Sequence, residues 1–185
     1  MSDGFTLWFT GLSGAGKTTI AEIVGPELER RGLLVEHLDG DIVRTHLSKG
    51  LGFSKEDRDI NIARIGWVAS RIARAGAAVV VSAISPYEEM RRHARSLVEQ
   101  HAPFVEIYVA TSLEECARRD PKGLYAAAFA GEIEDFTGVS APYEEPLDPE
   151  LRLETAGRTP TESAATVIER LEELNLLPER VESQA

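Results

Sequence analysis

A lysine and a threonine end a glycine-rich stretch near the start of the chain, in "FTGLSGAGKTT" (residues 9–19). Gly11, Gly16, Lys17 and Thr18 match the pattern G-x4-G-K-[ST], in which backbone N–H groups surround phosphate oxygens. The lysine adds positive charge against the β- and γ-phosphates, and the threonine hydroxyl can ligate Mg²⁺. The spacing predicts a nucleoside triphosphate site, in the first place for ATP. The residues expected to hold the nucleotide are Gly11, Ser13, Gly14, Ala15, Gly16, Lys17, Thr18 and Thr19.

Other segments indicate what becomes of the phosphate. GTPases read guanine with an Asn-Lys-x-Asp element, and "YVATSLEE" (108–115) has none. The run "VVVSAI" (79–84) lacks the terminal Asp of a Walker B motif, so a carboxylate must come from elsewhere to organise Mg²⁺ or accept a hydroxyl proton. Asp39 and Asp41 are the best placed, since they follow a predicted strand. These features favour a small-molecule kinase over a motor or a switch.

Predicted strands and helices alternate along the chain and must position these residues. The strands are expected at 5–10, 33–39, 77–84, 104–110 and 151–155. The helices are expected at 17–31, 54–75, 86–100, 112–119 and 160–177, with Ser54 as an N-cap and Pro86 in a first turn. The alternation predicts an α/β P-loop kinase fold, a five-stranded parallel sheet with helices on both faces. Ligands of such sheets bind beyond the carboxyl ends of the strands.

The remaining segments complete one predicted kinase domain over residues 1–178. The stretch 120–149 is rich in glycine, proline and acids, which predicts a mobile lid with one short helix. Residues 179–185 are expected to form a polar tail.

Composition narrows the function classes. The chain has 185 residues and a net charge of −11, which argues against a nucleic-acid partner because phosphate-backbone binding needs a basic surface. No apolar run reaches the ~18 residues of a membrane span, so no membrane is expected. The single cysteine, Cys116, excludes an internal disulfide and fits a reducing cytoplasm. The acidic start "MSDGF" does not resemble a signal peptide.

Six segments together resemble adenylylsulfate kinases, from about Leu7 to the last predicted helix. They are "GLSGAGKTT", "LDGDIVR", "LGFSKEDRDINIARIGWVA", "ISPYEEMR", "EIYVATSLEECARRDPKGLY" and "GEIEDFTGVSAPYEEP". The short motifs D-G-D-x-x-R, I-S-P-Y, D-P-K-G-L-Y and F-T-G within them are each weak alone, but in this order they are highly specific. The resemblance implies transfer of the γ-phosphate of ATP to the 3′-hydroxyl of adenosine 5′-phosphosulfate, in sulfate assimilation.

The resemblance also implies the roles of residues outside the phosphate loop. The residues expected to bind the substrate are Asp39, Asp41, Arg44, Phe53, Arg58, Asn61, Ile84, Ser85, Lys122 and Phe136. Arginine supplies forked donors that suit the phosphosulfate, and the two phenylalanines match the family's rings that sandwich the substrate adenine. The catalytic set expected is Lys17, Asp39, Asp41 and Ser85. The Mg²⁺ ligands expected are Thr18 and, as an open alternative, Asp39.

Two assignments stay open at this point. One aspartate of the pair Asp39 and Asp41 orients the hydroxyl and the other organises Mg²⁺, in either division. Ser85 corresponds to the family's serine that is assigned as a phosphoserine intermediate, but direct in-line transfer needs no covalent serine. We therefore interpret Ser85 mainly as a substrate contact, with Ile84 beside the nucleotide.

The sequence departs from the family in the predicted lid. After "DPKGLY" the family usually has two lysines and then an arginine, where this chain has Ala126, Ala127 and Phe129. Asp135 stands where a neutral residue is common. We therefore expect a less positive lid and weaker binding of an anionic substrate.

Several alternatives remain open. They are a kinase of the same shape acting on another hydroxyl, and a nucleotide-binding regulatory module without turnover. The resemblance to the family is the only basis for expecting a homodimer and a functional association with ATP sulfurylase. A free-standing enzyme and a piece of a fusion with ATP sulfurylase both fit the sequence.

Overall fold

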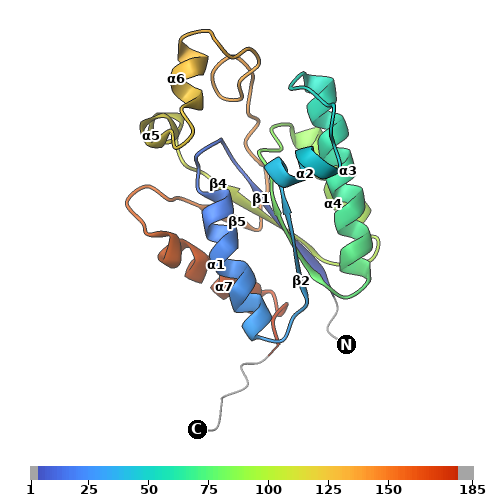
Figure 1. The fold of residues 1–185 in the computed structure, drawn as a ribbon. Coiled ribbons are helices and arrows are strands. Elements are labelled where there is room, and N and C mark those ends of the chain that lie inside the picture. The colour runs from blue at the N-terminus through green and yellow to red at the C-terminus, as the bar shows by residue number, and fades with distance from the viewer. Residues whose placement is uncertain (1–3, 179–185) are drawn as a thin grey trace.

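The computed structural model describes residues 4–178 and contains a five-stranded parallel sheet (Figure 1). The strands are β1 (Phe5–Thr10), β2 (Val35–Asp39), β3 (Ala78–Ser82), β4 (Phe104–Val109) and β5 (Leu151–Leu153). Their order in the sheet is β2-β3-β1-β4-β5, and every neighbouring pair is parallel. The predicted α/β fold is confirmed, and β1 lies at the centre of the sheet.

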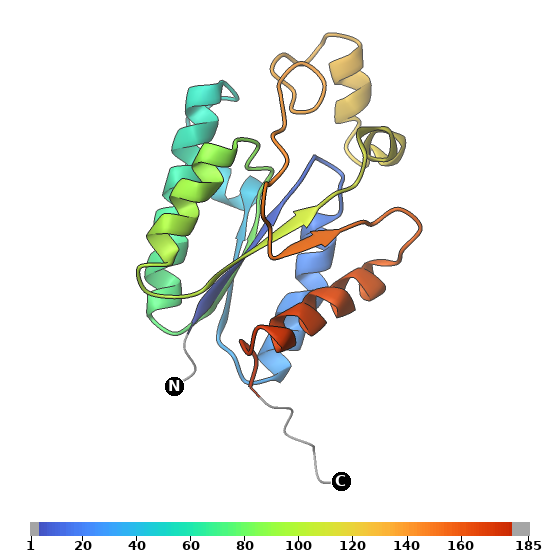
Figure 2. The same cartoon turned by 180° about the vertical axis from the view of Figure 1, so that it is seen from behind.

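Helices cover both faces of the sheet, as Figures 1 and 2 show from opposite sides. The helices are α1 (Lys17–Arg30), α2 (Gly40–His46), α3 (Lys55–Arg74), α4 (Glu88–Val98), α5 (Leu113–Arg119), α6 (Leu124–Phe129) and α7 (Pro160–Glu173). Helices α1 and α7 pack on one face, while α3 and α4 pack on the other. Helices α5 and α6 lie beyond the carboxyl ends of the strands (Figure 1). Between residues 4 and 178, no helix has both the length and the apolar character needed to cross a membrane.

The alternation of side chains along the central strand builds two apolar layers. Phe5, Leu7 and Phe9 belong to the cluster under α1 and α7, whereas Trp8 belongs to the cluster under α3 and α4. All four side chains are fully buried. Successive side chains of a strand point to opposite faces of the sheet, and burial on both faces is typical of a parallel sheet covered by helices on each side.

Capping side chains set the starts of several helices where the sequence predicted them. Ser54 accepts a hydrogen bond from the backbone N–H of Asp57 at 3.2 Å, so its role as N-cap of α3 is confirmed. Thr159 and Glu162 form a reciprocal capping box at the start of α7.

The structure shifts several predicted boundaries and adds one helix. Pro86 lies outside α4, which begins at Glu88 after an extended N-cap at Tyr87. The other shifts also shorten the predicted ranges: β2 begins at Val35, β3 ends at Ser82, β5 ends at Leu153, α4 ends at Val98 and α7 ends at Glu173. Helix α2 was not predicted, because the Asp-Gly pair at its start also suits a turn.

The segment 120–149 contains α6 as its only regular helix among the residues described, as predicted for the lid. Beside α6 it has an isolated bridge between Thr137 and Ala141. The predicted polar tail, 179–185, lies outside the described residues.

Candidate active site

The glycine-rich loop joins β1 to α1 at the carboxyl end of the sheet. Gly11 has φ 145°, and a Cβ built there would lie 2.6 Å from the carbonyl oxygen of Val109. Gly16 has φ 109° directly before the first turn of α1. Both positions require glycine, because L side chains rarely adopt such backbone angles. The loop therefore turns tightly and leads into a helix N-terminus, an arrangement that binds phosphate.

Lys17 is buried at the base of this loop. Its ammonium group donates hydrogen bonds to the carbonyl oxygens of Gly11 at 2.9 Å and Leu12 at 2.8 Å. Burial lowers the pKa of Lys17 from 10.5 to about 8, although Cys116 and the nearby aspartates act to raise it. A negative charge placed beside the loop, such as a phosphate, therefore stabilises the charged form of Lys17.

Thr18 and Asp39 meet across the base of the cleft. The Thr18 hydroxyl donates to Asp39 Oδ2 at 3.0 Å. Asp39 Oδ1 accepts from the backbone N–H of Asp41 at 2.9 Å and caps α2. No group of three or more His, Cys, Asp or Glu side chains that could hold a metal occurs within 4–178. A hydroxyl and one carboxylate still suit Mg²⁺, which keeps several waters and is usually completed by substrate phosphates.

Asp41 is oriented differently from Asp39. Its carboxylate forms an ion pair with Lys122, which comes from the predicted lid. Both side chains are mostly exposed, and the hydrogen bond from this pairing raises the pKa of Lys122. The pair connects α2 to the lid through solvent-exposed groups alone, a kind of contact that contributes little to stability.

Two arginines and an asparagine approach the cleft from α2 and α3. Arg44 donates to the carbonyl oxygen of Gly52 at 2.9 Å. Arg58 is buried, and burial lowers the pKa of its guanidinium. Asn61 is also buried, and its Oδ1 has no hydrogen-bond partner among residues 4–178. A buried polar atom without a partner is rare in folded proteins and is compatible with ligand binding.

Arg58 also joins α3 to the lid. Its Nε donates to the carbonyl oxygen of Phe53 at 2.6 Å. Its two terminal nitrogens donate to the Thr137 hydroxyl and the Asp135 carbonyl oxygen. Thr137 also lines the cleft, although the sequence analysis gave it no role. Its position next to Phe136 in the "DFTG" segment was the available signal.

The two phenylalanines of the expected clamp line the same cleft from different sides. Phe53 is 62% exposed, and the Arg44 guanidinium lies 4.5 Å from its ring centroid. Phe136 is half-buried and packs edge-on against Tyr125, with 5.0 Å between the ring centroids. The exposure of Phe53 shows that this ring does not belong to the core.

Ile84 and Ser85 lie where the chain leaves β3. Ser85 is buried, with φ 42°, and its hydroxyl accepts a hydrogen bond from Trp8 Nε1 at 3.1 Å. Because Pro86 is not in a helical turn and α4 begins only at Glu88, Ser85 lies in the loop three residues before the helix. Ser85 is therefore a buried loop residue whose hydroxyl is bonded to Trp8, and it is not a free hydroxyl at the first turn of a helix.

A single cavity of about 420 Å³ connects these groups. Its lining includes the predicted residues Ser13, Gly14, Gly16, Lys17, Thr18, Thr19, Asp39, Asp41, Arg44, Phe53, Arg58, Asn61, Ile84, Ser85, Lys122 and Phe136. The predicted residues Gly11 and Ala15 are not among the lining residues. The lining residues that sequence reasoning missed are Gly40, Ile62, Ser82, Ala83, Pro86, Asp120, Pro121, Leu124 and Thr137.

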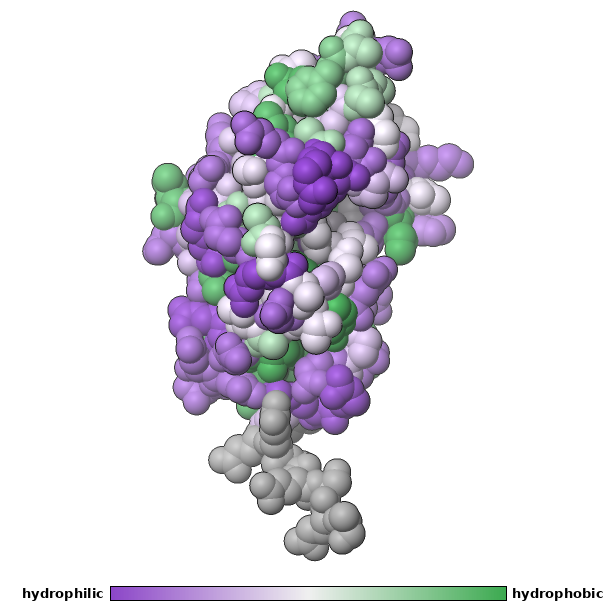
Figure 3. All heavy atoms as spheres, turned by 90° about the vertical axis from the view of Figure 1, so that its left-hand side faces the viewer, coloured by the Kyte–Doolittle hydropathy of each residue, from purple (hydrophilic) through white to green (hydrophobic). Residues whose placement is uncertain are grey.

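Part of the lid surface is apolar. Figure 3 shows apolar surface at the upper end of the face seen there. Phe129, on the α6 of this end, is 61% exposed. This exposure agrees with the expected lysine-poor lid, in which alanines and a phenylalanine replace cations.

Comparisons with known proteins agree with this geometry. The chain is 54% identical over 174 residues to the adenylyl-sulfate kinase of Picosynechococcus sp., covering 94% of this chain and 97% of that one. It is 52% identical over 177 residues to the probable bifunctional SAT/APS kinase 2 of Sorangium cellulosum, covering 96% of this chain but only 30% of that protein.

Structure comparison leads to the same family. The Mycobacterium tuberculosis APS kinase, solved in complex with AMPPNP and APS, superposes with a TM-score of 0.89. The two are 46% identical, and the alignment covers 93% of this chain and 99% of that one. The adenylylsulphate kinase family model matches residues 3–154. The phosphate loop, the sheet order and these similarities show that the chain belongs to the adenylylsulphate kinase family.

Proposed function

We propose that the protein transfers the γ-phosphate of ATP to the 3′-hydroxyl of adenosine 5′-phosphosulfate, giving ADP and 3′-phosphoadenylylsulfate. One observation carries this proposal. The phosphate loop lines the same cavity as the arginines, the asparagine and the two phenylalanines that suit a sulfonucleotide. A relative at 46% identity was solved with AMPPNP and APS, which supports the same pair of ligands.

The phosphate loop and α1 hold the triphosphate. Backbone N–H groups of the loop donate to its oxygens, and the Lys17 ammonium leaves its two carbonyl partners for the β- and γ-phosphates. Thr18 and Asp39 hold Mg²⁺, which neutralises charge on the phosphates. Asp39 suits this role better than Asp41, because its Oδ2 lies 3.0 Å from the Thr18 hydroxyl.

The opposite end of the cleft holds the acceptor. Arg44 and Arg58 supply forked donors to the phosphosulfate, and Asn61 brings an acceptor oxygen that has no partner in the described part of the chain. Phe53 and Phe136 stack on the two faces of the adenine. Lys122 then closes the lid side of the site.

Asp41 is the group that takes the proton. The 3′-oxygen attacks the γ-phosphorus, the bond from that phosphorus to the β–γ bridging oxygen breaks, and ADP leaves. The hydroxyl proton goes to the Asp41 carboxylate, which does not cap a helix and is mostly exposed to solvent. Ser85 contacts the substrate without becoming phosphorylated, and Ile84 packs beside the nucleotide.

A coupled assay of ADP release, with and without adenosine 5′-phosphosulfate, tests the proposal. We expect release that depends on the sulfonucleotide. AMP, which keeps the adenine and ribose but lacks the sulfate, should support far less release. A 3′-deoxy form of the sulfonucleotide should support none and should inhibit.

Other outcomes of this assay would identify the alternatives. Turnover only with a different hydroxyl compound would indicate a kinase of the same shape with another acceptor. Binding of both nucleotides without release would indicate a regulatory module. Either result would overturn the proposed function.

The proposal also includes the oligomeric state, one partner and the cellular location of the protein. A homodimer, a functional association with ATP sulfurylase and a cytoplasmic location remain predictions. Light scattering of the purified chain, with and without ATP sulfurylase, is the measurement that checks the first two.

A further inference from the structure

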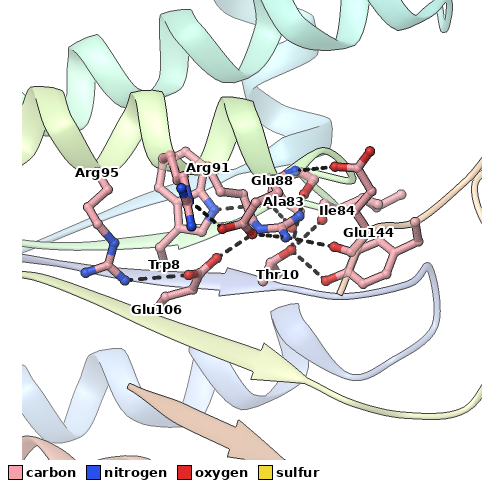
Figure 4. Close-up of polar contacts among 12 residues, drawn as sticks. Trp8, Thr10, Ala83, Ile84, Glu88, Arg91, Arg95, Glu106 and Glu144 are labelled. Carbon is pink, nitrogen blue, oxygen red and sulfur yellow. Dashed lines mark hydrogen bonds and ion pairs between the residues drawn. The ribbon is translucent and has the colours of Figure 1, made fainter. Parts of the chain in front are cut away.

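A fully buried arginine lies behind the cleft, outside the residues that line it. Arg91, on α4, is 1% exposed, and Glu106, on β4, is 5% exposed. Arg91 Nε lies 3.0 Å from Glu106 Oε1 (Figure 4). Burial raises the pKa of the Glu106 carboxyl, while Arg91 and Arg95 act to lower it. Since an isolated buried charge is costly, each member of this pair depends on the other.

The remaining nitrogens of Arg91 reach two separate segments of the chain. Its Nη1 donates to the carbonyl oxygen of Ser85 at 2.8 Å, in the turn at the floor of the cleft. Its Nη2 donates to the carbonyl oxygen of Glu144 at 2.7 Å, where the lid returns toward the sheet. The same Nη2 bonds the Glu88 carboxylate at 2.6 Å. Figure 4 shows these contacts meeting at one guanidinium.

The Ser85 turn needs support from its surroundings. Its φ of 42° is uncommon for a residue other than glycine, and such backbone persists only where neighbours hold it. Trp8 Nε1 bonds the Ser85 hydroxyl, and the Thr10 hydroxyl donates to the carbonyl oxygen of Ile84 at 2.7 Å. Arg91 adds the bond to the Ser85 carbonyl and so completes the support.

The returning end of the lid is tied to the same turn. The Tyr143 hydroxyl lies 2.9 Å from the Thr10 hydroxyl. The backbone N–H of Glu144 donates to the carbonyl oxygen of Pro86 at 2.8 Å. The Glu144 carboxylate accepts from the backbone N–H of Glu88 at 2.8 Å, at the start of α4. The lid is thus firmly held at this end, whereas its other end has the exposed pair of Asp41 and Lys122.

We propose that Arg91, held by Glu106, is a positioning residue that couples the closing lid to the Ser85 turn; this rests on the proposed function. Because one guanidinium bonds the carbonyl oxygens of both Ser85 and Glu144, the returning lid segment and the turn move together. Closure over the acceptor therefore leaves Ile84 and Ser85 aligned with the reacting groups. Arg91 itself touches no substrate.

Arg95 provides a matched control. It lies one helical turn further along α4 and pairs with the same Glu106 carboxylate, at 3.5 Å. It also holds Glu150 through two bonds of 2.8 Å. Glu150 directly follows the lid, but among the described residues no hydrogen bond or ion pair joins Arg95 to Ser85 or to Glu144. Loss of Arg95 therefore disturbs the same acid and helix without breaking the proposed coupling.

The experiment compares Arg91→Met with Arg95→Met, at temperatures where circular dichroism shows both to be folded. We expect kcat for sulfonucleotide-dependent ADP release to fall about 10- to 100-fold in Arg91→Met, because small misplacements in an active site cost about 10²-fold. Arg95→Met should keep kcat within about twofold. Equal losses in both variants, or an unchanged kcat in folded Arg91→Met, would overturn the proposal.

Trp8 supplies a readout that does not depend on the acceptor. The chain has two tryptophans, so Trp67→Phe leaves Trp8 as the only indole emitter. In that background, Arg91→Met should shift the Trp8 emission to the red and increase its quenching by acrylamide, as the turn loosens. Arg95→Met should change both less, because Arg95 reaches Trp8 only through Phe104, whose ring centroid lies 4.7 Å from the Arg95 guanidinium and 5.6 Å from that of Trp8. The same response in both variants counts against the coupling.

A milder variant covers the case in which Arg91→Met does not fold. Arg91→Lys keeps a buried cation beside Glu106, but its single nitrogen cannot replace the two guanidinium nitrogens that bond the carbonyl oxygens of Ser85 and Glu144. We expect KM for the sulfonucleotide to rise about 3- to 10-fold, with KM for ATP unchanged. Unchanged values for both substrates would contradict the proposal. If the unmodified protein shows no sulfonucleotide-dependent turnover, the proposed function fails, whereas the Trp8 emission still tests the pair.

Discussion

The two ends of the cleft are built in different ways. At the phosphate-loop end, the hydroxyls of Thr111 and Thr155 both donate to the carbonyl oxygen of Ala15, at 2.9 and 3.2 Å, and Lys17 is buried. At the other end, Phe53 is 62% exposed, and an exposed ion pair joins α2 to the lid. The donor end is thus fixed by buried contacts, and the acceptor end depends on segments that meet only across the cleft.

This contrast leads to an expectation about binding. ATP should bind with similar affinity when lid residues at the acceptor end are changed, because its loop has its own supports. Thr111 and Thr155, which follow β4 and β5, bond the carbonyl oxygen of Ala15, and the Tyr125 hydroxyl of α6 donates to the carbonyl oxygen of Ser13 at 2.9 Å. The sulfonucleotide should be sensitive to every lid contact.

Removing the charge at the donor end should have the largest effect. Lys17→Ala should reduce phosphoryl transfer to background, because the ammonium meets the transferring group in the transition state. The fold should stay intact, since a buried charge is removed together with its desolvation cost. Steady-state ADP release and thermal unfolding are the measurements. Near-normal turnover in this variant would contradict the assignment of the nucleotide site.

Changing the two aspartates should separate their roles. Asp41→Asn should lower kcat by about 10²- to 10⁴-fold with little change in sulfonucleotide affinity, as expected for loss of a general base. Asp39→Asn should instead raise the Mg²⁺ concentration needed for half-maximal rate, since Asp39 meets Thr18 at 3.0 Å. Single-turnover transfer at varied Mg²⁺ distinguishes the two. Identical behaviour of both variants would mean that the aspartates act as a unit.

The same contrast explains how much the sequence could predict. The phosphate loop was predictable because all the residues that form it are close together in the sequence. Gly11 and Gly16 are recognisable there because their backbone angles require glycine. The five strands were predictable because short apolar runs alternate with helical periods. Helix α2 was missed, although α5 of the same length was predicted, because its cap, Asp39, followed by Gly40, also suits a turn.

The tertiary contacts of the acceptor end were beyond sequence reasoning. Arg58 bonds Thr137, which is 79 positions away along the chain. No local pattern records such a pairing, because it is set by how α3 and the lid pack. The same holds for Arg91, whose partners come from three segments, the Ser85 turn, β4 and the lid. Only the resemblance to a family brought the acceptor residues together in advance.

A change in the lid should weaken only the acceptor. Phe136→Ala should reduce sulfonucleotide affinity by roughly 5- to 150-fold, because stacking on a base contributes about 1–3 kcal/mol. ATP affinity measured alone should barely change. Phe129→Ala is the control, because Phe129 is an exposed aromatic in the same lid but outside the cavity lining. Calorimetric titration of each nucleotide separately is the measurement. Equal loss of both affinities would place Phe136 outside the clamp.

Proton uptake on triphosphate binding at the donor end should also depend on pH, because Lys17 titrates there. Burial lowers its pKa to about 8, so about half of the free protein has a neutral Lys17 at pH 8. Triphosphate binding favours the charged form and should take up about half a proton at pH 8, falling to about a tenth at pH 7. Titration calorimetry in buffers of different ionisation enthalpy measures this uptake.

The sign of this effect can be checked in unfolding experiments. A lowered lysine pKa means that the folded state binds the proton more weakly than the unfolded chain does. Lys17 should therefore destabilise the free fold below pH 8, and this cost should diminish as the pH rises from about 8 toward 10.5. Lys17→Met should remove this contribution. Equal proton uptake at pH 7 and pH 8 would show that Lys17 is already charged in the free protein.

The smallest effect on catalysis is expected at Ser85. Ser85→Ala should keep the transfer rate within about tenfold, because in-line displacement needs no phosphorylated enzyme. Its main effect should be on stability. The Trp8 Nε1 donor, 3.1 Å from the Ser85 hydroxyl, would lose its partner in a buried site, which costs about 1–3 kcal/mol. In a Trp8→Phe background the same substitution should cost less, because no donor is left unpaired. Transfer from a chiral γ-phosphate decides the chemistry: inversion supports direct displacement, whereas retention would mean two displacements through Ser85 and would contradict this assignment.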